Sequence, residues 1–157
     1  MTVEIERKFL VDDPPAGPDR GPGETIRQGY LAEEGDIAVR IRITDRVATL
    51  TVKAGRGIQR AEIERPLAAD EADALWSHTE GRRIDKVRHR IALDDGSIAE
   101  LDVYAGGLDG LHTVEVEFDS AERAAAFRPP SWFGTELTDV PGWTNAELAR
   151  MGRPARP

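Results

Sequence analysis

The sequence predicts a mainly β protein: a mostly antiparallel sheet, closed or nearly closed, with two or three short helices. Segments of alternating apolar and polar residues recur about eight times along the 157 residues, and each alternation indicates a strand. The segments between them are short and rich in Gly, Asp and Pro, as is typical of turns. The polar faces of these strands carry mostly charged residues, so the question for function is what these faces hold.

The first predicted strand is the stretch VEIERKFLV, residues 3–11. Its period of two places Glu4, Glu6 and Lys8 on one face and mainly apolar residues on the other. The Pro-rich and Gly-rich residues 12–23 that follow are predicted to form a loop.

Four further strands are predicted before the middle of the chain. They cover residues 25–31, 37–44, 47–54 and 59–67, with turns at the EEGD, DR (residues 45–46) and GRGI stretches. Their charged faces carry these residues: Arg40, Arg42, Lys53, Arg60, Glu62 and Glu64.

A helix is predicted next, over residues 68–81. Asp70 is the expected N-cap, acidic residues crowd the first turn, and Gly81 is expected to end the helix.

Three more strands are predicted within residues 83–93, 97–106 and 111–119, the first two joined by a hairpin at DDG. Their charged faces carry these residues: Lys86, Arg88, Arg90, Glu100, Asp102, Glu115 and Glu117.

Two short helices complete the prediction. Ser120 is expected to cap the first, and Thr144 with Glu147 fits a capping box on the second. We expect one domain over residues 1–150, followed by a disordered tail over residues 151–157.

Composition excludes several kinds of site. The chain has no cysteine, and its three histidines, His78, His89 and His112, show no metal-ligand spacing. Any metal would therefore be held by carboxylates, which favours Mg²⁺ or Mn²⁺. The net charge of −8 argues against a nucleic-acid partner, and no signal peptide or membrane-length apolar run is present. We expect a cytoplasmic protein without a membrane partner.

Three predicted strands carry a Glu-x-Glu pair: Glu4 and Glu6, Glu62 and Glu64, and Glu115 and Glu117. Side chains two positions apart on one face lie about 6.5–7 Å apart, so each pair repels, and more strongly in an enclosed space. Divalent cations would relieve this repulsion, and a multiply charged anion would do the same for the Arg and Lys pairs. The pattern thus indicates a metal–polyphosphate site. The plainer interpretation is a set of solvated faces with cross-strand ion pairs.

An ordered series of short motifs resembles the CYTH superfamily, the triphosphate tunnel metalloenzymes, in its compact bacterial form. The motifs are EIERK (4–8), QGYL (28–31), VRIR (39–42), TVK (51–53), EIE (62–64), KVR (86–88), ELDVY (100–104), VEVEF (114–118) and NAELA (145–149). The resemblance spans about residues 2–150 and implies an eight-stranded antiparallel β-barrel with a charged tunnel. His89 and Ala99 depart from a pattern common in such members, which leaves substrate preference in question.

The resemblance also implies a role for each charged group. Metal ligands are expected among Glu4, Glu6, Glu62, Glu64, Asp102, Glu115 and Glu117. Triphosphate ligands are expected among Lys8, Arg40, Arg42, Lys53, Arg60, Lys86 and Arg88. Glu64, Glu117 and Lys86 are the candidate catalytic residues, with a carboxylate orienting the attacking water.

The function implied is metal-dependent hydrolysis of a small-molecule triphosphate, foremost inorganic tripolyphosphate to pyrophosphate and phosphate, by a monomer or homodimer. A class IV-type adenylate cyclase and a thiamine triphosphatase are alternatives, because the family contains both. A polyphosphate-binding or nucleotide-binding module without catalysis is a second alternative, and a purely structural barrel a third.

Overall fold

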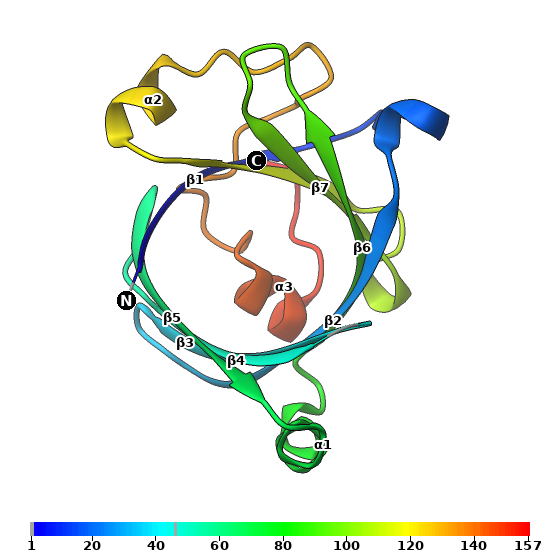
Figure 1. Cartoon of the computed structure of the whole chain (residues 1–157), viewed down its shortest axis with the longest axis vertical. Helices are drawn as coiled ribbons and strands as arrows, with labels where there is room; N and C mark the ends of the chain where they lie inside the picture. Colours follow the sequence, from blue (N-terminus) through cyan, green and yellow to red (C-terminus); the bar gives the residue numbers. More distant parts are fainter. Residues whose placement is uncertain (1, 46) are drawn as a thin grey trace.

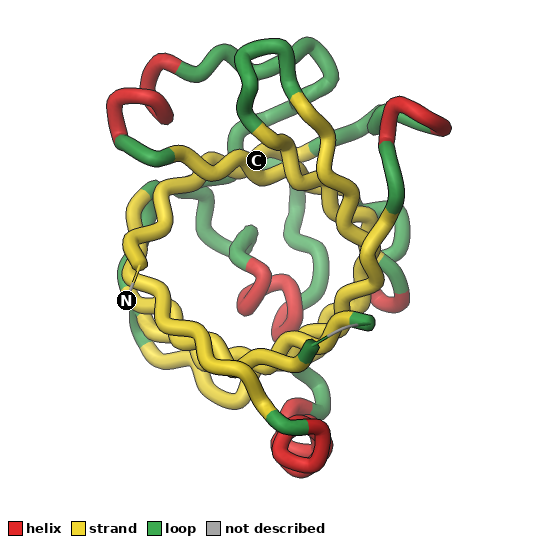
Figure 2. Tube along the Cα trace, in the orientation of Figure 1, coloured by secondary structure: helices red, strands yellow, loops and turns green. Residues whose placement is uncertain are grey.

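The computed structural model describes residues 2–45 and 47–157, and within them eight antiparallel strands close into a barrel (Figures 1 and 2). Around the barrel the order is β1-β5-β4-β3-β2-β6-β7-β8. The strands are β1 (Thr2–Leu10), β2 (Gly23–Glu34), β3 (Ile37–Thr44), β4 (Ala48–Ala54), β5 (Gln59–Leu67), β6 (Arg83–Ala92), β7 (Ile98–Tyr104) and β8 (His112–Phe118). The predicted fold class is confirmed.

Strand β2 is longer than the sequence predicts. The turn expected over the whole EEGD stretch is made only by Gly35 and Asp36, because Glu33 and Glu34 still belong to β2. Pairing with β3 continues because a register shift between Tyr30 and Ala32 absorbs one residue, as a β-bulge does. The turn predicted at residues 45–46 falls partly on Arg46, which lies outside the described residues.

The helices are short: α1 (Ala69–Trp76), α2 (Ala121–Ala126) and α3 (Asn145–Met151), with 3₁₀ turns at Gly17–Arg20, Ser77–Thr79 and Gly106–Leu108. The expectation that Asp70 caps α1 was wrong. The N-cap is Ala68, whose backbone N–H donates to Glu71, while Asp70 lies in the first turn. The predicted caps of the other two helices are confirmed, because the Ser120 and Thr144 hydroxyls accept from backbone N–H groups.

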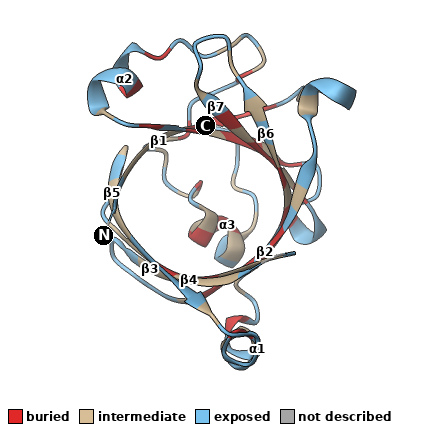
Figure 3. Ribbon diagram, in the orientation of Figure 1, coloured by how far each residue is buried: buried red, intermediate tan, exposed pale blue. Residues whose placement is uncertain are grey.

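The main apolar core lies outside the barrel. Side chains on the outer face of β1, β7 and β8 pack against α2 and the segment after it, in a cluster that includes Phe9, Leu101, Val116, Phe127 and Phe133. Figure 3 shows buried residues along β1, β6 and β7, whereas β3, β4 and β5 are more exposed. The interior is therefore free to carry charge, because stability comes from apolar packing elsewhere.

A second apolar cluster lies at the end of the barrel where α3 sits (Figure 1). Trp143 and Leu148 pack there against Leu10 and Tyr104, and the Tyr104 hydroxyl donates to Asn145 at 2.7 Å. Backbone hydrogen bonds also tie residues 134–137 to the last part of β1. The α3 end of the tunnel is thus covered by the C-terminal part of the chain.

None of the helices in the described part of the chain is long and apolar enough to span a membrane. The boundary between a domain ending at residue 150 and a disordered tail stays a prediction.

Candidate functional site

A cavity of about 440 Å³ occupies the barrel interior and extends to the segment before α3. The alternation in each strand turns the charged faces inward, as predicted. Of the predicted site residues, these line the cavity: Glu4, Glu6, Lys8, Arg40, Arg42, Lys53, Arg60, Glu62, Glu64, Arg88, Glu115 and Glu117. They come from six different strands, and closure of the barrel brings them together. The remaining two, Lys86 and Asp102, lie behind this lining.

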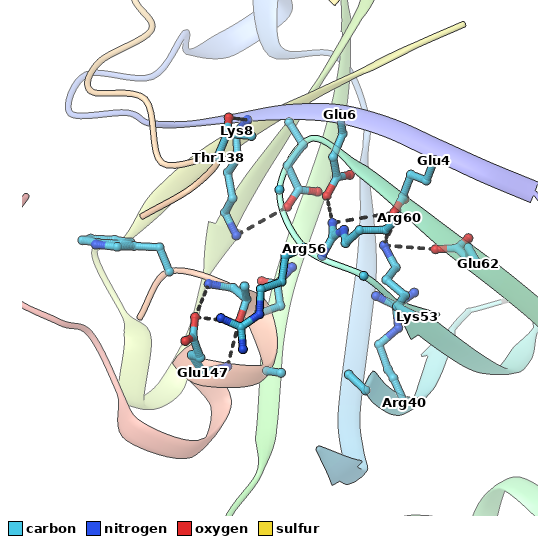
Figure 4. A pocket seen from close by; sticks show the side chains of 18 of the residues that line it. Glu4, Glu6, Lys8, Arg40, Lys53, Arg56, Arg60, Glu62, Thr138 and Glu147 are labelled. Atoms are coloured by element: carbon cyan, nitrogen blue, oxygen red, sulfur yellow. Dashed lines mark hydrogen bonds and ion pairs between the residues drawn. The ribbon is translucent and has the colours of Figure 1, made fainter. Parts of the chain in front are cut away.

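Strand β1 places acidic groups beside basic groups from β4 and β5 (Figure 4). Lys53 donates to Glu4 at 2.7 Å and pairs with Glu62 at 3.0 Å. Arg60 forms an ion pair with Glu6 and lies 3.7 Å from Glu4. The predicted ligands of metal and of phosphate are therefore interleaved in this part of the tunnel.

The guanidinium groups of β3 are poorly compensated. Among the described residues Arg42 makes no ion pair, and its one hydrogen bond is to Gln28 at 3.4 Å. Burial, together with the neighbouring Arg40 and Arg88 charges, lowers the pKa of Arg42 to about 10. The Nε atoms of Arg40, Arg42 and Arg60 are buried without a hydrogen-bond partner. Buried donors without acceptors are costly, so this part of the tunnel favours a bound anion.

The opposite wall contains a compact ion network. Arg88 donates to both Asp102 oxygens at 2.7 Å and to Glu115 at 2.9 Å, and Lys86 lies 2.6 Å from Asp102. Burial raises the pKa of Asp102, but Arg88 and Lys86 outweigh it and hold the pKa below its ordinary value. Lys86 and Asp102 have no exposed side-chain surface, so in this structure they support the lining rather than form it.

Glutamates in the tunnel are at least partly buried and repel one another. Burial, then repulsion from Glu115 and Glu4, raises the pKa of Glu6 to about 7. Burial and repulsion from Glu4, Glu100 and Glu62 likewise raise the pKa of Glu117. A cation at these carboxylates would relieve the repulsion.

These carboxylates fit a hard divalent cation by their chemistry, since they offer several oxygen donors and little else. Glu6 and Glu117 are cross-strand partners on β1 and β8, and Glu4 lies on the same face of β1 as Glu6. Among the described residues, however, no three carboxylate or imidazole groups are gathered closely enough to hold a metal ion. Lys53 and Arg60 occupy two of these carboxylates, so metal binding requires those ion pairs to loosen.

Other groups in or behind the tunnel lining were not among the predicted site residues. Gln28 and Thr51 are completely buried, and Tyr30 lines the cavity. The sequence pattern could have identified these three residues, because each lies two positions from another inward-facing polar residue on its strand. Thr138 and Glu147 also line the cavity, but they come from the C-terminal segment, where no strand pattern points to the tunnel.

With this geometry in place, comparison with known proteins decides the family. The CYTH domain model matches residues 2–129. The chain belongs to the CYTH family. Members of this family generally depend on a divalent metal.

Two curated relatives of this CYTH protein are both named inorganic triphosphatase. One, from Nitrosomonas europaea, is 44% identical over 148 residues, covering 94% of this chain and 97% of the relative. The other, from Acetivibrio thermocellus, is 33% identical over 152 residues, covering 96% and 95%. A crystal structure of an inorganic triphosphatase matches with a TM-score of 0.71 and 41% identity, covering 96% of each chain.

Proposed function

We propose that this chain hydrolyses inorganic tripolyphosphate to pyrophosphate and phosphate, with Mg²⁺ or Mn²⁺. The observation that carries the proposal is one cavity in which buried guanidinium nitrogens lack hydrogen-bond acceptors, while burial and mutual repulsion raise the pKa of the nearby Glu6 and Glu117. A metal–triphosphate complex supplies both missing partners. The similarity to two proteins named inorganic triphosphatase supports this choice of substrate.

Binding rests on the basic side chains. Arg40 and Arg42 present unpaired donors, and Lys8 has one weak ion pair, to Glu115 at 3.4 Å. Guanidinium groups bind phosphoryl oxygens in pairs of hydrogen bonds, so these residues would hold and align the substrate. Three further cations complete the set: Lys53 and Arg60, once their glutamate partners turn to the metal, and Arg88, which stays bound to Asp102.

The divalent ion would be held by carboxylates of β1 and β8, namely Glu4 and Glu6 with Glu115 or Glu117. When bound, the ion would neutralise phosphoryl oxygens and polarise the scissile phosphorus. Further candidates for metal ligands are Glu62, Glu64 and Asp102. Asp102 is the least accessible of these three, because Lys86 and Arg88 surround it.

Water attacks in line, oriented by a carboxylate at the tunnel mouth. Glu64 and Glu117 are the candidates, and the Glu64 side chain is 45% exposed, which leaves it accessible to water. Fixed charges aligned with the transferring phosphoryl group supply most of the acceleration. In this proposal Lys86 acts through Arg88, by holding Asp102 in place, and a direct catalytic role for Lys86 stays a prediction.

We expect the protein to act in the cytoplasm as a monomer or homodimer, without nucleic acid or membrane. The central test measures phosphate release from tripolyphosphate, ATP and thiamine triphosphate, each with Mg²⁺, with Mn²⁺ and with a chelator. Chelator-sensitive release that is fastest with tripolyphosphate is the expected result. Cyclic AMP formed from ATP would replace the proposal with a cyclase, and binding without turnover of any substrate would replace it with a binding module.

A further inference from the structure

One row of side chains crosses three neighbouring strands of the tunnel wall. Arg40 on β3 lies opposite Thr51 on β4, and Thr51 lies opposite Glu64 on β5. Thr51 has no exposed surface, whereas Glu64 reaches the solvent-accessible mouth. The row therefore joins a phosphate-binding candidate to a water-orienting candidate through a single buried hydroxyl.

The Thr51 hydroxyl is hydrogen bonded on both sides. It donates to Oε1 of Glu64 at 3.0 Å and accepts from Nη2 of Arg40 at 3.3 Å. The same Arg40 nitrogen is 3.8 Å from that Glu64 oxygen, too far for a direct hydrogen bond. A hydroxyl has one proton to donate and lone pairs to accept with, so Thr51 satisfies both neighbours at once.

We propose that Thr51 is a positioning residue that keeps Glu64 and Arg40 apart and correctly aimed; this rests on the proposed triphosphatase function. Held by Thr51, the Glu64 carboxylate keeps its second oxygen free for water. Arg40, relieved of a direct contact with that carboxylate, keeps its unpaired Nε–H for a phosphoryl oxygen.

Removal of the hydroxyl leaves the carboxylate two alternatives. Glu64 can close the 3.8 Å gap and pair directly with Arg40, which takes a donor from the substrate. It can also rotate toward bulk solvent, where it no longer orients the attacking water molecule. The first alternative weakens substrate binding and the second lowers kcat.

The test compares Thr51→Val, which keeps the side-chain shape, with Thr51→Ser, which keeps the hydroxyl. We expect Thr51→Val to lower kcat on tripolyphosphate about 10-fold to 100-fold and Thr51→Ser to stay within about 3-fold of wild type. Thr49→Val is the matched control, since Thr49 lies on the same face of β4 and its hydroxyl makes no hydrogen bond to the described residues. It is expected to keep wild-type kcat and KM.

A double-mutant cycle with Glu64→Gln separates positioning from a structural effect. If Thr51 acts through Glu64, Thr51→Val lowers kcat little further in the Glu64→Gln protein. The Kd for tripolyphosphate, measured by calorimetry with Mg²⁺, is expected to rise in Thr51→Val and to recover in the double variant. An equal loss of kcat in both backgrounds, or a Thr51→Val protein with wild-type kcat and Kd, overturns the inference.

The wild-type protein distinguishes this inference from the proposed function. Wild-type turnover together with an inert Thr51→Val change removes only the role of Thr51. If the wild-type protein binds tripolyphosphate but does not hydrolyse it, the triphosphatase function is wrong. If, in that case, Thr51→Val also leaves the Kd for tripolyphosphate unchanged, the positioning role of Thr51 is wrong as well. A wild-type protein that neither binds nor hydrolyses tripolyphosphate overturns both.

Discussion

Two walls of the same tunnel each carry an arginine, but among the described residues only one of the two arginines is ion-paired. On the β6–β7–β8 wall, Arg88 pairs with Asp102, Glu100 and Glu115. On the β3 wall, Arg42 has no carboxylate partner among the described residues. Pairing, rather than residue type, therefore separates a charge that is held by neighbouring carboxylates from a charge that a ligand can reach without breaking an ion pair.

The largest expected effect comes from removing the acidic side of the site. The Glu4→Gln/Glu6→Gln double variant should lose at least about 10³-fold of its metal-dependent turnover, because the ion loses two oxygen ligands and several kcal/mol of charge stabilisation. Phosphate release over a range of Mg²⁺ concentrations measures this loss, and circular dichroism checks the fold. Glu34→Gln is the control, as Glu34 is an exposed glutamate on β2. Full turnover in the double variant would show that the metal ligands are misassigned.

Substitutions on the β6–β7–β8 wall, where Arg88 is ion-paired, should lower the stability of the protein. Asp102→Asn leaves Lys86 and Arg88 without their shared buried anion, so we expect a loss of about 3–5 kcal/mol in the free energy of unfolding. Denaturant titration measures it. Glu100→Gln on the same strand removes a more exposed partner of Arg88 and should cost about 1 kcal/mol or less. Equal losses in the two variants would mean that burial of the Asp102 pair is not what stabilises this wall.

A substitution on the β3 wall, where Arg42 has no ion-pair partner among the described residues, should affect activity rather than stability. Arg42→Met removes a buried cation without a partner, so the stability of the ligand-free protein should stay the same or rise by about 1 kcal/mol. The same change should lower kcat/KM on tripolyphosphate about 10²-fold, because a phosphate-binding donor is lost. Thermal unfolding with and without tripolyphosphate and Mg²⁺ tests both, since ligand should raise Tm less in the variant. A marked loss of stability without ligand would place Arg42 with the structural charges.

The smallest effect concerns an ion pair outside the tunnel. Arg7 donates two hydrogen bonds of 2.7 Å to Glu136, and these hold the pKa of Glu136 below its ordinary value of 4.5. A lowered pKa means that the pair stabilises the fold above about pH 4.5 and that this contribution disappears as the pH falls through the folded pKa. Because Glu136 is 40% exposed, Glu136→Gln should cost only about 0.5–1 kcal/mol at pH 7.

Unfolding of wild type and Glu136→Gln at pH 7 and at pH 3 checks the sign of this effect. The difference between the two proteins should shrink at the lower pH. A difference that grew on acidification would contradict the lowered pKa.

Residue spacing within each segment is enough to predict the strands and the common face of their charges, and the ordered motifs carry the resemblance to the family. Strict alternation decides which side of a strand a residue occupies, because successive side chains point to opposite faces. Glu4, Glu6 and Lys8 can therefore be assigned to one face from their spacing alone. The caps at Ser120 and Thr144 are equally predictable, since a cap depends on residues close together in the chain.

Which charges pair and which stay free depends instead on how the strands meet in the barrel. Arg42 and Arg88 look alike in sequence, each on a strand with a second basic residue two positions away. Their partners come from neighbouring strands, so the register of β6 with β7 gives Arg88 an aspartate, while that of β3 with β4 places a threonine opposite Arg42. The role of Thr51, the burial of Lys86 and the covering of the tunnel by α3 follow from the same cause. Each depends on contacts between residues far apart in the chain, which alternation within one strand cannot specify.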